Sequence, residues 1–421
     1  MARDYYAMST AEKILTMVLL CLSGSLMYWM PFFSEIFYVP MQDAFGFSKT
    51  QLGLLSSIFG TTSLIGYFPG GWLADRISSR KLISAALLIT AAGSSIFSTI
   101  PTFEVCVLLY AIWGISTACI FWSAMIKATR KLAASEEQGR AFGILEGGRN
   151  SVDMVTATIF LSIFAFRGGD SSALSETILL LALILLFLAV LVWTVMKEDR
   201  APEEEAKEER SKHSIKEIIE VMKLPIVWLL AIIILAAYSG LWGAIYFTPY
   251  ATEVFSLSAV LGGAIGTGKL WLAFLAAIAA GFIADRMGNA KAVLGAFILM
   301  TFGFLVFGLV PGAPSLVPLL LINVAAITIA VYALRGIYFS LLEQGGIPVA
   351  ATGMATGIIS VIGYTPDIFM PTLGGVILDA YPGSDGYQRL FLLVAALSFL
   401  GMIAAYIVYR KTQDRQVVSP T

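Results

Sequence analysis

Charged residues are scarce in this chain of 421 residues, where Asp, Glu, Lys and Arg together make up 13%. Soluble domains carry about 25%. Hydrophobic residues make up 58% of the chain, and its mean hydropathy is +0.83. The formal net charge of -1 gives none of the basic excess that nucleic-acid binding requires. The composition therefore predicts a chain embedded largely in the lipid bilayer, with no nucleic-acid partner.

Histidine and cysteine are nearly absent as well. The one histidine, His213, lies in a densely charged segment, and the three cysteines (Cys21, Cys106 and Cys119) lie in apolar runs. Such cysteines are expected to pack as small hydrophobic residues, without a disulfide. The sequence also lacks a phosphate-binding loop, a nucleophile elbow and a cluster of metal ligands. We therefore expect no enzyme, no catalytic residue, no metal and no cofactor.

A cleavable signal peptide is not expected either. The N-terminal stretch MARDYYAMSTAEK is polar and poor in basic residues, unlike the start of a secretory signal. The apolar run that follows continues past Pro31, which is too long for the apolar region of a signal. This run is expected to stay in the protein as a membrane span.

Twelve apolar runs are about as long as, or longer than, the ~20 residues that a helix needs to cross a bilayer. The sequence thus predicts an all-α polytopic membrane protein, with six helices in residues 1–196, a charged cytoplasmic linker in 197–223, and six helices in 224–421. The runs are 12–38, 51–73, 82–100, 104–128, 141–166, 174–196, 225–252, 259–283, 291–311, 315–341, 352–378 and 388–409.

The basic residues predict the orientation of these spans. If both termini lie on one side, the opposite side holds only Lys49, Arg167 and Arg389. Three more basic residues fall within spans, and the rest of the 27 lie on the side of the termini. Because cytoplasmic loops are enriched in Lys and Arg, both termini and the linker are expected in the cytoplasm. The cell membrane, in particular a bacterial inner membrane, is the expected location.

An internal repeat connects the two halves. The stretches GGWLADRISSRK (70–81) and AGFIADRMGNAK (280–291) share five residues at a constant offset, and each follows the second span of its half. Parallel six-span repeats are typical of one large class of transporters. The first stretch is similar to the turn motif of the major facilitator superfamily, with Ser78 in place of its second glycine. The chain as a whole resembles that superfamily.

The resemblance implies a secondary active transporter that works by alternating access. In this family the turn motif is thought to latch the two halves together on the cytoplasmic side. The gating candidates that follow are Asp75, Arg76, Arg80, Asp285 and Arg286. The alternative is that the basic residues only determine the topology.

A polar face interrupts the fifth span. Glu146, Arg149, Asn150 and Asp153 are spaced so that a helix places all four on one side. Charges inside a span are costly and normally face a cavity or one another. Arg149 can reach Glu146 at i-3 or Asp153 at i+4. One interpretation is an inert ion-pair network, and the other is part of a substrate site.

Two aspartates occupy matching places in the two halves. Aligning GILEGGRNSVD (143–153) with GIISVIGYTPD (357–367) superposes Asp153 on Asp367. Acidic residues in the cavities of this family often carry protons, so Asp367, Asp153 and Glu146 are the candidates for proton coupling. Asp367 has no basic neighbour within a helical turn.

Basic residues inside spans of both halves indicate an anionic substrate. Arginine presents a planar fork to a carboxylate, sulfonate or phosphate, and lysine a compact charge. The predicted substrate-binding residues are Arg149, Asn150, Lys269 and Arg335, together with the aromatic residues Tyr28, Trp242 and Tyr338. The aromatic residues are chosen because spans one, seven and ten line the cavity in this family.

Two departures separate the chain from known subfamilies. Ala111 stands where proton-driven exporters of the superfamily carry an arginine, and spans one and seven lack the arginines of organophosphate antiporters. We expect a monomeric, proton-coupled symporter of a small organic anion. The alternatives are an exporter of a cationic or amphipathic compound and a non-transporting membrane sensor.

Overall fold

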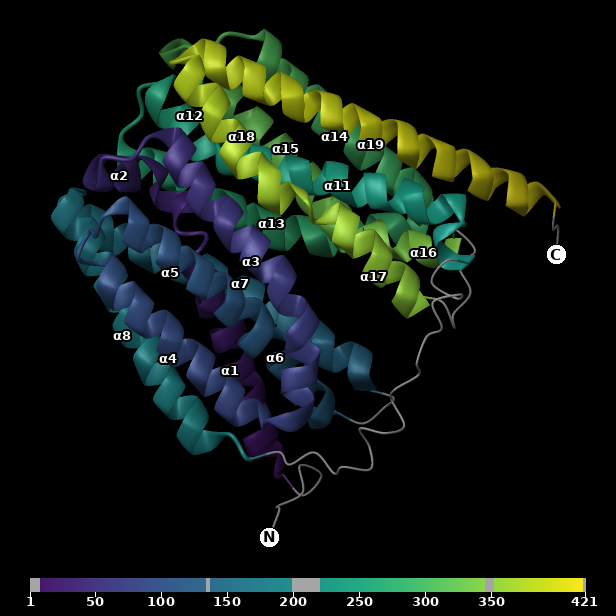
Figure 1. Cartoon of the computed structure of the whole chain (residues 1–421). Helices are drawn as coiled ribbons and strands as arrows, with labels where there is room; N and C mark the ends of the chain where they lie inside the picture. The colour runs from purple at the N-terminus through teal and green to yellow at the C-terminus, as the bar shows by residue number, and fades with distance from the viewer. Residues whose placement is uncertain (1–7, 134–136, 199–219, 345–351, 419–421) are drawn as a thin grey trace. The chain divides into compact units, whose positions relative to one another are not determined.

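The computed structural model describes residues 8–133, 137–198, 220–344 and 352–418 (Figure 1). Within these ranges the chain is built of helices and contains no strand. The helices of the N-terminal half are α1 (Thr10–Trp29), α2 (Ser34–Phe45), α3 (Lys49–Arg76), α4 (Ser79–Phe97), α5 (Phe103–Ile115), the π-helical segment Ser116–Trp122, α6 (Ser123–Leu132), α7 (Gln138–Phe166) and α8 (Ser171–Val195).

The C-terminal half is helical in the same way. Its helices are α11 (Pro225–Ile245), α12 (Phe247–Glu253), α13 (Ala259–Met287), α14 (Asn289–Leu309), α15 (Val317–Ile337), α16 (Leu341–Gln344), α17 (Thr352–Gly363), α18 (Pro366–Ala380) and α19 (Ser384–Val418), with 3-10 turns at Pro314–Leu316 and Tyr338–Ser340.

The all-α prediction is confirmed, and each of the twelve predicted apolar runs overlaps a helix. Ten helical segments of the described chain are long and apolar enough to cross a membrane. The remaining two runs fall on α3 and α7, which are 28 and 29 residues long but more polar. The extra polarity of α7 comes from the polar face predicted in span five.

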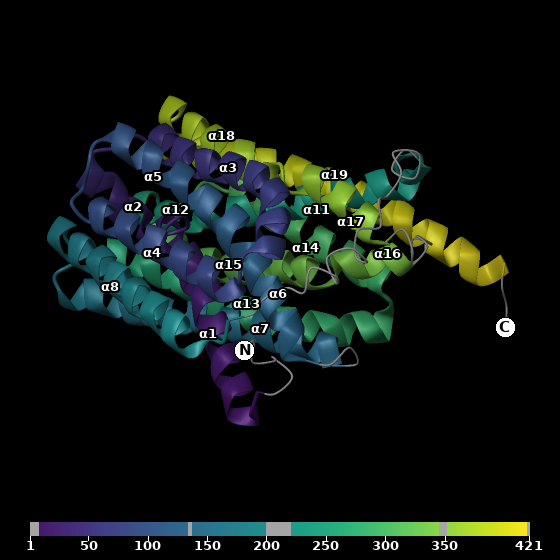
Figure 2. The same cartoon turned by 60° about the horizontal axis from the view of Figure 1, so that its bottom comes forward.

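The helices form two compact units. One contains residues 1–47 and 54–211, and the other contains residues 48–53 and 212–421. In the first unit α4 packs along α8, and α1 packs against α7. In the second unit α19 packs along α14 and α11, as Figures 1 and 2 both show. Residues 199–219, most of the predicted linker, lie outside the described residues.

Side-chain caps set several of the helix starts. At α1, Ser9 and Glu12 form a reciprocal capping box: Glu12 N donates to Ser9 Oγ at 3.3 Å and Ser9 N to Glu12 Oε2 at 2.8 Å. At α8, Ala173 N donates to Asp170 Oδ1 at 2.9 Å. These carboxylate and hydroxyl oxygens satisfy N–H groups that a helix start leaves without a partner.

Three predicted spans are each divided between two helices. The first span breaks after Trp29 and the seventh after Ile245, and the eleventh is divided between α17 and α18. Pro249 follows the second break by four residues. Because proline has no backbone N–H group, it cannot donate a hydrogen bond to the carbonyl oxygen of Ile245, and in a continuous helix its ring would clash with that carbonyl group. Pro366 is the first residue of α18, which is the helical position that proline tolerates best. Broken helices place backbone polar groups inside a span, where they need side-chain partners.

Candidate functional site

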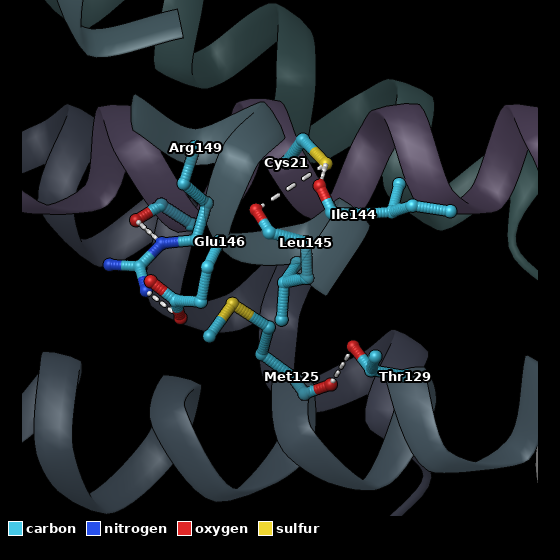
Figure 3. Close-up of polar contacts among 8 residues, drawn as sticks. Cys21, Met125, Thr129, Ile144, Leu145, Glu146 and Arg149 are labelled. Carbon is cyan, nitrogen blue, oxygen red and sulfur yellow. Dashed lines mark hydrogen bonds and ion pairs between the residues drawn. The ribbon is translucent and has the colours of Figure 1, made fainter. Parts of the chain in front are cut away.

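Arg149 of α7 is tethered at two of its nitrogens. Its Nε donates to the carbonyl oxygen of Gly24 in α1 at 2.9 Å, and its Nη1 donates to Glu146 Oε1 at 2.8 Å (Figure 3). The Arg149 side chain is 15% exposed and the Glu146 side chain 55%. The prediction that Arg149 reaches Glu146 along the helix is therefore confirmed.

Two aromatic rings flank the same guanidinium group. The Arg149 Cζ atom lies 5.5 Å from the ring centre of Tyr28 and 5.4 Å from that of Trp122. Both distances are within the range of a cation–π interaction. Trp122 ends the π-helical segment Ser116–Trp122, and such segments occur often at functional sites. Tyr28 is among the substrate-binding residues that the sequence predicts, and Trp122 is not.

The remaining donors of Arg149 define what this cluster can bind. Its hydrogen bonds to described residues use Nε and Nη1, and no described residue accepts a hydrogen bond from Nη2. A guanidinium group has five N–H donors. The ones that remain form part of a fork. Asn150, the next residue of α7, is exposed. This arrangement suits an anionic oxygen.

Asp153, one turn further along α7, has different partners. Its Oδ1 accepts hydrogen bonds from Ser25 Oγ and, at 3.2 Å, from Trp29 Nε1 of α1. No ion pair joins it to Arg149 among the described residues. The sequence allowed Arg149 to pair with either acid, and the structure pairs it with Glu146 alone.

Small residues allow α1 and α7 to approach closely enough for these contacts. A methyl group added at Gly24 would lie 2.8 Å from Arg149 Cδ, and one added at Gly148 would lie 2.4 Å from Cys21 Sγ. The Cys21 thiol lies 3.8 Å from the carbonyl oxygens of Ile144 and Leu145 in α7 (Figure 3). Cys21 is a buried free cysteine, as its apolar setting predicted.

In the second unit, Arg335 lies in the last turn of α15. A positive charge at this end of a helix interacts favourably with the helix dipole. Its Cζ atom is 5.5 Å from the ring centre of Tyr332 and 5.8 Å from that of Tyr238. The Tyr238 ring packs against Tyr364 of the α17–α18 break at 4.5 Å. Arg335 is exposed, and its contacts with described residues are the Tyr332 and Tyr238 rings, without a hydrogen bond or ion pair. Its donors are thus open to a ligand.

Asp367 and Trp242 form a pair in this unit. Asp367 lies in the first turn of α18, and its Oδ1 accepts a hydrogen bond from Trp242 Nε1 of α11 at 2.7 Å. Trp242 and Tyr338 are both 5% exposed, so neither predicted aromatic ligand is open to solvent in this conformation. Their predicted contact with substrate stays a prediction.

Lys269 is the most deeply buried of the predicted binding residues, with 2% exposure. Its Nζ donates to the carbonyl oxygen of Ala244 at 3.2 Å, next to the end of α11. This contact stabilises the backbone at the break in span seven. The geometry favours a structural role for Lys269, and its predicted role as a substrate ligand is untested.

The gating residues of the turn motif are only partly described. The side chains of Asp75 and Asp285 lie outside the described residues, although both positions are helical. Arg76 stacks on Trp72 at 4.2 Å, and Arg286 is exposed. Arg80 Nη2 lies 3.2 Å from Glu198 Oε2, the second residue of the predicted linker. The proposed latch between the halves therefore stays a prediction.

Trp29 is a residue that sequence reasoning missed. A tryptophan near the middle or end of a span is usually explained by packing or by the membrane interface. Its contact with Asp153 joins residues that are 124 positions apart, and no periodicity reports such a contact. One signal was present: Trp29 and Trp242 match at an offset of 213, within one residue of the offset of 214 between Asp153 and Asp367.

Known proteins show which family has this architecture. The family model of the Major Facilitator Superfamily matches residues 15–365. "Inner membrane protein YihN" of Escherichia coli (strain K12) is 27% identical over 413 residues, which cover 97% of this chain and 98% of that protein.

The described residues contain no group of three or more His, Cys, Asp and Glu residues that could hold a metal ion.

Solved structures share the fold at low sequence identity. A bacterial homologue of the human lysosomal transporter Spinster, in an inward-facing and occupied conformation, has a TM-score of 0.77 and 13% identity, with 96% of this chain and 98% of that chain covered. A mutant of the nucleoside transporter NupG has a TM-score of 0.74 and 14% identity, with 94% and 100% covered. At these identities the similarity concerns the fold alone.

Proposed function

Since the chain belongs to the Major Facilitator Superfamily, we propose that it is a secondary active transporter of a small organic anion, coupled to protons. The substrate carries a carboxylate, a sulfonate or a phosphate group and crosses the cytoplasmic membrane by alternating access. The observation that carries the proposal is the tethered Arg149, whose Nη2 has no partner among the described residues.

Tethering makes this guanidinium group a prepared binding group. Two hydrogen bonds and two aromatic rings fix its position, so little side-chain entropy is lost when a ligand binds. An arginine needed only to neutralise Glu146 would not require this support. In the proposal, Arg149 and Asn150 bind the anionic group, and Tyr28, whose ring centre is 5.5 Å from the guanidinium carbon, contacts the ligand beside them.

Arg335 supports an anionic substrate independently. It has no hydrogen-bond partner among the described residues and lies against Tyr238 and Tyr332. An exposed charge inside a span normally faces a cavity. An anionic ligand would supply the missing acceptors. In the proposal Arg335 is a second anion-binding group, and Trp242 and Tyr338 become accessible in other conformations of the transport cycle.

The proton-coupling role is assigned to Asp153 and Asp367. Both lie in the fifth span of their half, both accept indole hydrogen bonds, and neither forms an ion pair with a described residue. Glu146 is already engaged by Arg149 in an ion pair, which makes it a weaker candidate for carrying the transported proton. Gating remains assigned to the turn motifs at Asp75 and Asp285, with Arg76, Arg80 and Arg286.

Substitution of Arg149 tests the anion proposal. Purified full-length chain is screened for thermal stabilisation by short carboxylates, sulfonates and phosphate esters, and by organic cations and sugars. With the best stabilising anion, Arg149→Lys should weaken binding roughly tenfold or more, since a charged hydrogen bond contributes ~1.5–3 kcal/mol. Arg167→Lys is the matched control, because Arg167 pairs with Glu176 at a surface position.

A triple variant separates binding from charge neutralisation. If Arg149 only compensates the acids, Arg149→Ala with Glu146→Gln and Asp153→Asn should recover both stability and anion binding. Recovery of binding in that variant would eliminate Arg149 as a ligand. Stabilisation by organic cations alone would instead support export of a cationic compound.

A further inference from the structure

Among the described residues, each half of the chain has a hydrogen bond from an indole to an aspartate inside a span. Trp29 Nε1 donates to Asp153 Oδ1 at 3.2 Å, and Trp242 Nε1 donates to Asp367 Oδ1 at 2.7 Å. In both cases the tryptophan belongs to the first span of its half and the aspartate to the fifth. The partners are 124 and 125 residues apart. The same contact thus occurs twice, at equivalent places.

Both tryptophans lie beside a break in their helix. Trp29 is the last residue of α1, and Trp242 precedes the end of α11 by one turn. They are 7% and 5% exposed, so their N–H groups need a partner inside the protein. The aspartates supply it. In the second unit Tyr246 Oη adds a further contact by donating to the carbonyl oxygen of Pro371 in α18 at 3.0 Å.

An indole can only donate, and this determines which oxygen of the carboxyl group takes up a proton. The oxygen that faces the N–H must keep a lone pair toward it in either protonation state. In each aspartate Oδ1 is engaged in this way, whereas Oδ2 accepts no hydrogen bond from a described residue. Protonation at Oδ2 keeps the indole bond to a carbonyl oxygen, whereas protonation at Oδ1 weakens it, because a hydroxyl oxygen is the poorer acceptor.

The charged neighbours do not reverse this preference. Around Asp153 they are Arg149 on the same helix and Glu35 on α2, and Ser25 Oγ also donates to Oδ1. Around Asp367 the charged neighbour is Arg335 of α15. None of these groups makes a hydrogen bond with Oδ2.

We propose that Trp29 and Trp242 are positioning residues, which hold one carboxyl oxygen of Asp153 and of Asp367 and direct the transported proton to the other oxygen. The inference rests on the proton-coupling role proposed above. It adds a specific proton-accepting atom, Oδ2, and two residues that act through the aspartates. In this arrangement loss of the indole N–H leaves the aspartate able to bind a proton but changes the hydrogen bonding of its C=O group.

Infrared difference spectroscopy of the purified full-length chain tests this without a known substrate. Lowering the pH should produce C=O stretching bands of protonated carboxyl groups, and Asp153→Asn and Asp367→Asn should each remove one band. Trp29→Phe and Trp242→Phe should keep those bands but shift them to higher wavenumber, because the C=O group loses its indole donor. The shift should be smaller for Trp29→Phe, since Ser25 Oγ still donates to Asp153 Oδ1. Trp228→Phe is the control, since Trp228 Nε1 donates to the carbonyl oxygen of Met222.

The outcomes distinguish this inference from the proposed function. If the Asp→Asn variants remove bands but the Trp→Phe variants leave their positions unchanged, the positioning role is wrong and proton binding stands. If neither Asp→Asn variant removes a band, proton coupling through these residues is itself wrong. Should a Trp→Phe variant not fold, the wild-type chain labelled at the indole nitrogen provides the test. Two of its eight tryptophan N–H signals should then titrate together with the carboxyl bands.

Discussion

At the scale of single residues, Lys269 shows how burial changes the interpretation of a charge inside a span. Its position in the middle of α13 suggested a substrate ligand, because a charge there normally faces a cavity. The side chain is instead buried and donates to the carbonyl oxygen of Ala244. The sequence could not predict this contact, since the carbonyl becomes available only where span seven breaks.

Replacement of Lys269 separates the two roles. Lys269→Met should lower the free energy of unfolding by about 1–3 kcal/mol, because the Ala244 carbonyl loses a buried donor. Thermal unfolding of the purified chain measures this, and Lys291→Met at an exposed position of the same unit is the control. A variant that keeps its unfolding temperature but loses stabilisation by the anion would make Lys269 a substrate ligand.

Arg149 shows what sequence can predict at this scale. Helical spacing correctly placed Glu146 within reach, as their 2.8 Å contact shows. It could not choose between Glu146 and Asp153, because that choice depends on Ser25 and Trp29 from another helix. Local spacing predicts which pairs are possible, and tertiary contacts decide which of them form.

At the scale of helices, the number and type of elements followed from the apolar runs, whereas their interruptions did not. A run of about 20 apolar residues predicts a spanning helix from its length and composition alone. Pro249 and Pro366 are visible in the sequence, but a proline inside a span can bend a helix or end it. Contacts with other helices, which the apolar pattern does not report, decide which of the two occurs.

The contact between α1 and α7 depends on small residues, and adjacent glycines offer a matched test. A methyl group at Gly148 would lie 2.4 Å from Cys21 Sγ, whereas at Gly147 nothing lies within 4 Å. Gly148→Ala should therefore destabilise the chain by about 1–3 kcal/mol through overpacking. Gly147→Ala should be neutral or stabilising by up to about 1 kcal/mol, since alanine favours a helix.

Thermal unfolding of both variants in the same detergent provides the measurement. Because the Gly148 clash lies one residue from Arg149, weaker anion binding should accompany the loss of stability. Equal unfolding temperatures for the two variants would mean that α1 and α7 can separate at no cost. The Arg149–Gly24 hydrogen bond would then not depend on close helix packing.

At the scale of the whole molecule, the repeat in the sequence predicted two related halves, and two compact units are found. Their boundary is not a simple cut, because residues 48–53 at the start of α3 belong to the second unit. There Asp379 accepts hydrogen bonds from the backbone N–H groups of Lys49 (3.1 Å) and Thr50 (2.8 Å). An apolar run gives no sign of such a capping contact from a residue so distant in the sequence.

Orientation in the membrane rests on the distribution of basic residues. Lys49, Arg167 and Arg389 are the only ones predicted on the outer side, and cytoplasmic loops are enriched in Lys and Arg. Single cysteines are introduced at Ser171 and Gln413, both exposed, in a chain whose three native cysteines are replaced. In intact cells a membrane-impermeant thiol reagent should label the first site and not the second.

Permeabilised cells provide the control for this labelling, because both sites should react there if Gln413→Cys is accessible. Labelling of Gln413→Cys in intact cells, with Ser171→Cys protected, would reverse the orientation and place the turn motifs outside. The basic residues would then have failed as a topology signal.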